Sequence, residues 1–371
     1  MRLRSVSSGL FTGIPSLRRI TRLFQTLHEA NQIGVLNSYF IYFEMRFGPP
    51  WEVFGLTGDS KKSRDFRTSI GGQALIEGVM MRGPKRMAIV VNTKEGFVTK
   101  VDDLKLLKEK YPIVGFVFIR GVVNFINSMS VGMRSLMFSA ECMPEEEQEE
   151  PSKFDEWVER KLGTEKAEKI LITFSLVLGI ALSVGLFIIL PTLLAGFLAD
   201  VVEHRVLRNL IEGLMRITIF LLYMWLATRM NAIKRVWAYH GAEHKAIYCY
   251  EKGLPLTVEN VRMQSRLHPR CGTSFLFIVM LTSIFVFSFT SWSNVWMRIG
   301  FRLALLPVVV AISYEIIKLA GRYDNILTRI ISAPGKAMQR LTTREPDDAM
   351  IETAVEALKL VIPENDEEAK W

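Results

Sequence analysis

Long apolar runs dominate the second half of the chain and alternate with short polar connections. Residues 170–199 are 30 consecutive positions without a charged side chain, and residues 272–297 are 26 more. A helix of about 20 apolar residues crosses the hydrocarbon core of a bilayer, so both runs predict membrane spans. Two weaker apolar runs, 210–228 and 303–320, complete a predicted bundle of about four spans.

The two weaker spans carry charged pairs. Glu212 precedes Arg216 by four residues and Glu315 precedes Lys318 by three, so each pair shares one helical face. An acid inside a membrane span is a functional candidate by default. Pairing within one helical turn explains these acids equally well. They therefore indicate either a transport path or structural ion pairs.

A different pattern precedes the membrane region. Residues 68–142 predict a β-hairpin with strands at Met87–Val91 and Phe97–Val101, followed by an amphipathic helix on the membrane surface. Glycines in the stretch 71–83 exclude one long helix there. Residues 143–169 predict an acidic linker and a lead-in helix.

The C-terminal segment, residues 321–371, predicts a helix that ends near Leu360. Its apolar side chains recur at helical spacing and form one stripe, which predicts docking on the polar part of the protein. The stripe consists of Met350, Ile351, Ala354, Val355 and Leu358. Together these patterns predict an α-helical integral membrane bundle with a small cytoplasmic α+β portion.

Residues 1–67 predict a basic N-terminal extension outside this fold. Its first 28 residues contain five arginines, four serines and no acid. Three interpretations fit this composition: a disordered arm on anionic lipid, an organellar transit peptide, or sequence upstream of the true start.

Lysine and arginine counts predict the orientation of the spans. The loops before, between and after the four spans hold five, two, eight, two and five of these residues in turn. Basic loops stay in the cytoplasm, so both termini and the His-rich loop 229–271 are predicted to be cytoplasmic. The same flanks account for the net charge of +8, and no nucleic-acid partner is expected. Three cysteines form no disulfide framework, which indicates a reducing compartment.

The His-rich loop carries the candidate chemistry. In the sequence HGAEHK, His240 and His244 are four apart and project from one face of a helix. Paired histidines of this kind bind zinc, and the neighbouring Glu243 is placed to take a proton from a water molecule on the metal. Downstream, His268 and Cys271 offer an imidazole and a thiolate. Either could be the third ligand.

Three interpretations of this cluster stay open. Three protein ligands with an open fourth position would make a catalytic site. Four ligands from His240, His244, His268 and Cys271 would make a closed structural site. Without a metal, the histidines would bind lipid phosphate or carboxylates. Weaker additional candidates are Glu77 in a glycine-rich bend, Glu315 in the last span, and Asp324 after it.

The chain resembles the YqhQ-like family of bacterial multi-span membrane proteins, a domain of unknown function described as a predicted metal-dependent enzyme. Four stretches carry the resemblance, which covers about residues 68–362: GGQALIEGVMMRGP, HGAEHKAIYCYE, HPRCGTSF and LTTREPDDAMIETA. It implies a bacterial plasma-membrane protein with a metal on His240 and His244, with His268 as a candidate third ligand and Glu243 nearby. It supplies no reaction.

The leading hypothesis is a metal-dependent hydrolase at the cytoplasmic membrane face. Zinc is the divalent metal that histidine and cysteine ligands favour. The lipid bilayer is the expected partner, and a lipid-linked or membrane-anchored substrate suits the location. The alternatives are a non-catalytic membrane scaffold with a structural metal site, and a transporter. The sequence does not determine the oligomeric state.

Overall fold

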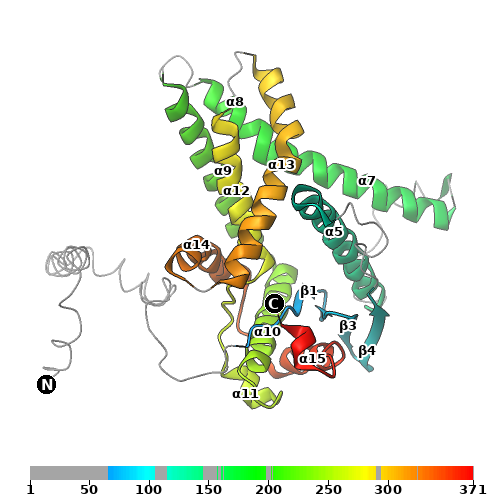
Figure 1. The fold of residues 1–371 in the computed structure, drawn as a ribbon. Helices are drawn as coiled ribbons and strands as arrows, with labels where there is room; N and C mark the ends of the chain where they lie inside the picture. Colours follow the sequence, from blue (N-terminus) through cyan, green and yellow to red (C-terminus); the bar gives the residue numbers. More distant parts are fainter. Residues whose placement is uncertain are drawn as a thin grey trace, which may run out of the picture. The chain divides into compact units, whose positions relative to one another are not determined.

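The structure, a computed structural model, describes residues 66–104, 115–144, 157, 160–161, 163–197, 202, 204–289, 294–323 and 325–370. All of them fall in one compact unit, Asp59–Trp371. The expected extension 1–67 and the expected linker 143–169 lie largely outside the described residues. Most of the described chain is helical, with one small antiparallel sheet (Figure 1).

The sheet has four strands in the order β1-β2-β3-β4. They are β1 (Gly71–Leu75), β2 (Gly78–Arg82), β3 (Arg86–Thr93) and β4 (Gly96–Asp103). The hairpin expected from the sequence is β3 and β4, which confirms that prediction. A second hairpin, β1 and β2, was not predicted. Its tight turn places Glu77 at a φ of 47°, a conformation in which residues other than glycine are uncommon.

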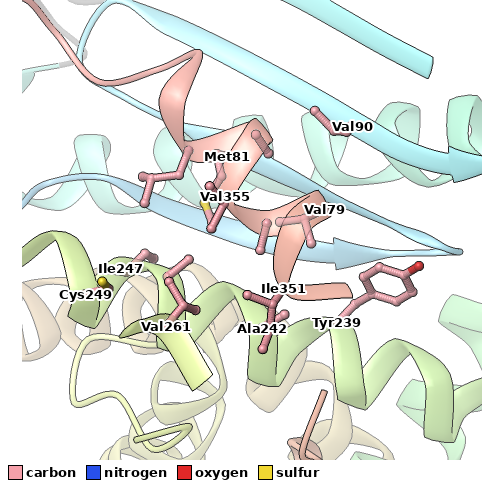
Figure 2. Packing of buried hydrophobic residues seen from close by; sticks show 14 of the residues in the cluster. Val79, Met81, Val90, Tyr239, Ala242, Ile247, Cys249, Val261, Ile351 and Val355 are labelled. Atoms are coloured by element: carbon pink, nitrogen blue, oxygen red, sulfur yellow. The ribbon is translucent and has the colours of Figure 1, made fainter. Parts of the chain in front are cut away.

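Helices cover both faces of this sheet. One face packs against α5 (Val117–Glu141), which lies where the amphipathic helix was expected. The other face packs against α10 (Asn231–Glu251) and α15 (Asp348–Lys359). Figure 2 shows α15 side chains Ile351 and Val355 beside Val79 and Met81 of the sheet. All five residues of the predicted apolar stripe are buried, which confirms the docking role of the C-terminal helix.

Within the described residues, three helical runs are long and apolar enough to cross a membrane: Ile170–Phe197, Leu207–Ala227 and Val295–Arg322. The first consists of α7 (Thr164–Val184) from Ile170 onwards, a π-helical turn (Gly185–Ile189) and α8 (Leu190–Phe197). The others are α9 (Arg205–Ala227) and α13 (Val295–Arg322). Most large apolar side chains on α7 are exposed, which is compatible with membrane association.

The third expected span differs from the prediction. Residues 272–297 were expected to form one helix, but α12 (Gly272–Ser288) has 17 residues and is about 26 Å long at the α-helical rise. The next helix, α13, starts eight residues before the expected 303 because Asn294 caps it by accepting hydrogen bonds from Trp296 and Met297. Consequently Arg298 and Arg302 lie inside α13.

The remaining elements connect these parts. They are α11 (Val258–Arg262), α14 (Ile326–Thr342) and a short 3-10 turn (Asp366–Ala369). Helix α12 packs against α9, α13 and α14, and α10 packs against α15 and β1. The apolar helices meet the rest of the molecule at the start of α12, where Cys271 lies beside His240 of α10, and along α13, which packs against α5.

Candidate metal centre

Helix α10 is the platform of the site. Ten successive residues, from Ala238 to Ile247, are buried, so the middle of this helix is enclosed on every side. The sheet and α15 cover one side of it. The small residues Gly241, Ala242 and Ala246 leave room for neighbouring chain to approach closely.

The closest approach is made by the segment that follows α14. The Arg344 amide donates a hydrogen bond to the Trp237 carbonyl, 2.8 Å away. A Cβ atom on Gly241 would overlap the carbonyl oxygen of Arg344. Glycine at 241 therefore lets this segment lie directly on α10. The contact also brings the carbonyl of Thr342 to His240.

Backbone carbonyls fix both imidazoles of the motif. His240 Nδ1 lies 2.8 Å from the carbonyl oxygen of Thr342, and His244 Nδ1 lies 2.6 Å from that of Arg266. A carbonyl only accepts hydrogen bonds, so each Nδ1 carries a hydrogen and donates it. Each Nε2 then keeps its lone pair when the ring is neutral, which is the state in which histidine binds a metal.

Both imidazoles lie beside Cys271. His240 Nε2 lies 3.1 Å from the Cys271 sulfur, and the two imidazole rings are 4.4 Å apart. One ligand atom from each of His240, His244 and Cys271 lies within 4.8 Å of the others, and all three residues are buried. Among the described residues this is the group of histidine, cysteine and acidic side chains whose spacing fits a metal ion.

The charges of the group support a thiolate. Burial alone would raise the pKa of Cys271, but the charges of His240 and His244 hold that pKa well below its usual range. Burial alone would lower the pKa of His240, but the Cys271 sulfur raises it to about 9. Cys271 also caps α12, and its sulfur accepts the Thr273 amide at 3.4 Å. A helix N-terminus stabilises a thiolate in the same direction.

Glu243 adds a buried carboxylate beside the group. Its Oε2 atom lies 3.9 Å from His240 Nε2 and has no hydrogen-bond partner in the described part of the chain. Burial raises the pKa of this carboxyl group, while the nearby histidines and the Gly72 backbone amide oppose that shift. A Cβ on Gly72 would press on the Glu243 side chain, so the glycine of β1 makes room for it.

His268 belongs to a neighbouring network. Its Nε2 lies 3.4 Å from Glu251, which also pairs with Arg270 and accepts the Thr68 amide at 2.9 Å. The Gln339 side chain holds the His268 backbone through two hydrogen bonds of 2.8 and 2.7 Å. Burial lowers the pKa of His268 to about 4. Its ring lies 5.7 Å from that of His244, and it is outside the metal-type group.

The weaker candidates lie elsewhere. The Glu77 carboxylate pairs with Arg235 and accepts from the Tyr239 hydroxyl at 3.2 Å. Glu315 pairs with Arg120 of α5, not with Lys318 as the spacing suggested. Asp324 lies outside the described residues.

Sequence reasoning missed the groups that orient the ligands. The carbonyls of Thr342 and Arg266 carry no signal in their side chains, so no pattern could identify them. Glu251 and Gln339 were also missed. Glu251 offered one signal, because it is a buried acid two turns after His244 on the same helix.

The comparisons with known proteins follow this geometry. The family model described as "Protein of unknown function (DUF1385)" matches residues 116–364, which include His240, His244 and Cys271. "Uncharacterized protein YqhQ" of Bacillus subtilis (strain 168) is 34% identical over 294 residues, which cover 77% of this chain and 90% of that protein. No solved structure matches the chain.

Proposed function

This chain belongs to the DUF1385 family, and from its own residues we propose an integral membrane protein whose buried metal centre serves a hydrolytic reaction at the cytoplasmic membrane face. The observation that carries the proposal is the convergence of His240, His244 and Cys271, with two more atoms left without a partner. These are His244 Nε2 and Glu243 Oε2, both buried and lacking a hydrogen bond within the described residues.

The donor set fits a divalent metal. Two imidazole nitrogens and one thiolate are ligands that zinc prefers. Both histidines already donate Nδ1–H to backbone carbonyls, the arrangement that orients metal-binding imidazoles. A bound metal would also satisfy the buried Nε2 of His244, which otherwise costs free energy as an unpaired polar atom.

The number of ligands favours catalysis over a purely structural site. Structural zinc is usually enclosed by four protein ligands, whereas catalytic zinc has three and an open position. The group contains three, because His268 is engaged by Glu251. A metal held here would act as a Lewis acid towards whatever occupies the open position. Glu243, with its raised pKa and unpartnered oxygen, is placed to accept and return a proton.

A non-catalytic scaffold is the alternative, and the role of Glu243 distinguishes it from a catalyst. If Glu243 were a fourth ligand, the site would be closed and the carboxylate would have a structural role. A transporter has less support at Glu315, because that carboxylate is tied to Arg120.

The location suggests an amphiphilic substrate. Cys271 is the N-cap residue of the apolar helix α12, so the metal centre lies where polar and apolar parts of the molecule meet. A substrate anchored in the bilayer would reach the metal centre without leaving the membrane.

Topology can be tested with reporters at the C-terminus. We propose a plasma-membrane protein in which the run Ile170–Phe197 and helices α9, α12 and α13 cross the bilayer, with both termini in the cytoplasm. A C-terminal green fluorescent protein should fluoresce, a C-terminal alkaline phosphatase should be inactive, and alkaline carbonate should leave the chain in the membrane pellet. Active phosphatase at the C-terminus would contradict a cytoplasmic C-terminus.

Metal content tests the centre. The full chain, purified in detergent from zinc-supplemented cells, is expected to hold about one zinc per chain by plasma mass spectrometry. His244→Ala and Cys271→Ser should each reduce that content about tenfold or more, because each removes a ligand. His268→Gln is the matched control, since it changes a buried histidine of the neighbouring network, and it should keep its zinc. Equal losses in His268→Gln and His244→Ala would contradict the assignment.

Glu243→Gln separates catalyst from scaffold. It should keep zinc and the wild-type elution profile, because the carboxylate is not a ligand in this proposal. Membrane lipid and peptide profiles of cells that produce wild type, Glu243→Gln or His244→Ala should differ in one amphiphile, depleted by wild type alone. Loss of zinc in Glu243→Gln would instead make Glu243 a ligand and favour the scaffold.

A further inference from the structure

A second buried polar cluster lies within the apolar helices. Glu212 on α9 pairs with Arg302 on α13, and its second oxygen accepts from Arg302 Nη2 at 2.7 Å. Arg216, one turn further along α9, lies 3.5 Å from the same carboxylate. The exposed fractions of Glu212, Arg216 and Arg302 are 1%, 6% and 2%. Thr192 of α8 donates to Glu212 at 2.9 Å and completes the cluster.

The cluster is not electrically balanced. Two guanidinium groups face one carboxylate, and Glu212 is the one acid that the described residues place on either of them. One net positive charge is therefore enclosed among apolar helices. An enclosed charge without a counterion is costly, and in span-length helices such residues usually mark a ligand path.

The donors of the cluster are also not all used. Arg216 donates to the Phe187 carbonyl at 2.9 Å and to the Ser283 hydroxyl at 3.0 Å. Arg302 Nε, in contrast, is buried and has no acceptor within the described residues. Arg208, one turn before Glu212 on α9, repeats this feature, because its Nε is likewise buried and without an acceptor there. Two guanidinium groups thus have an unsatisfied nitrogen: Arg302 on α13, and Arg208 on α9 one turn before the Glu212 that pairs with Arg302.

The residues around the cluster indicate which class of ligand it would bind. The Phe287 ring of α12 faces both arginines that pair with Glu212, at 5.3 Å from the Arg216 guanidinium and 5.5 Å from that of Arg302. The accepting carbonyl of Phe187 belongs to the π-helical turn, a feature that often accompanies functional sites. Guanidinium forks match the oxygens of phosphate groups, and aromatic walls suit an amphiphile that carries one.

We propose that Arg208, Arg216 and Arg302 form a binding site for a phosphate-class oxyanion, separate from the metal centre. Arg216 and Arg302 supply the net positive charge, and Arg208 and Arg302 supply the unsatisfied N–H donors. Cys271 and Phe287 lie 16 residues apart on α12, about 24 Å along its axis, so the two sites lie at opposite ends of one helix. The oxyanion is either a free phosphate ion or the headgroup of an anionic lipid.

Thermal unfolding of the purified full chain tests this site. In uncharged detergent, millimolar inorganic phosphate should raise the unfolding midpoint by about 2 °C or more over chloride at equal ionic strength, if the ligand is free phosphate. If the ligand is a lipid, the increase should appear instead in nanodiscs of phosphatidylglycerol over nanodiscs of a phosphate-free glycolipid.

Variants locate the effect. Arg208→Gln should abolish the increase, because Arg208 has few structural partners and supplies an unsatisfied donor. Arg322→Gln, at the other end of α13, is the matched control and should preserve it. Should Arg208→Gln fail to fold, Arg208→Lys keeps the charge without the fork and should weaken the increase. The proposal is wrong if neither phosphate source raises the midpoint, or if Arg208→Gln responds as wild type does.

Discussion

Gly241→Ala is expected to abolish zinc binding and to lower the unfolding midpoint by about 5 °C or more, although it adds a single methyl group. The methyl carbon would overlap the carbonyl oxygen of Arg344. That obstacle is backbone, so no side-chain rotation relieves it. The segment must move away from α10, and the Thr342 carbonyl moves with it. His240 then loses the hydrogen bond that orients its ring.

A second glycine provides the control for this substitution. Gly179 lies within α7, and a Cβ there meets nothing within 4 Å. Gly179→Ala should therefore keep its zinc, and its unfolding midpoint should stay level or rise, because alanine favours the helix. If Gly241→Ala kept both its zinc and its midpoint, the segment after α14 would not be what holds the site together.

Gly241 also shows what can and cannot be predicted from the sequence. The spacing of His240 and His244 placed both imidazoles on one helical face, and the structure has them there because helical periodicity is a local property. The apolar stripe of the C-terminal helix was equally local. Gly241 lies between the two histidines in the same motif, but its role depends on a segment about 100 residues further along the chain. No local pattern carries that information.

The sequence did not reveal which charged residues pair with a partner on another helix. Sequence spacing paired Glu212 with Arg216 and Glu315 with Lys318, since neighbours on a helix can be read from the chain. The structure gives both acids a stronger partner on another helix: Arg302 for Glu212, and Arg120 for Glu315. Bidentate geometry with a neighbouring helix outweighs a within-helix pair, because the latter is worth only a few tenths of a kcal/mol.

The third ligand was left open for a related reason. His268 and Cys271 are three residues apart, so both reach the same region of the fold. What separates them is Glu251, which engages the His268 ring, and the start of α12, which directs the Cys271 sulfur towards His240. Competition for a side chain by a distant acid becomes visible only when the two elements are packed together.

Glu212→Ala is expected to have an effect as large as that of Gly241→Ala. It should lower the free energy of unfolding by about 3–5 kcal/mol. Removing this carboxylate leaves Arg216 and Arg302 buried without a counterion, and the loss is mainly the cost of the two uncompensated charges. Glu315→Ala is the matched comparison. Its pair with Arg120 is about one-quarter exposed on each side, so water solvates the remaining arginine and the loss should stay near 1 kcal/mol.

A double variant separates lost attraction from stranded charge. Glu212→Leu combined with Arg302→Met removes the pair and one of the two cations together, and should recover at least half of the midpoint lost in Glu212→Ala. Thermal unfolding in detergent, followed for the single and double variants under one condition, measures the coupling. If the unfolding midpoint of Glu212→Ala equalled that of wild type, water would already reach this carboxylate. The enclosed net charge on which the oxyanion site depends would then not exist.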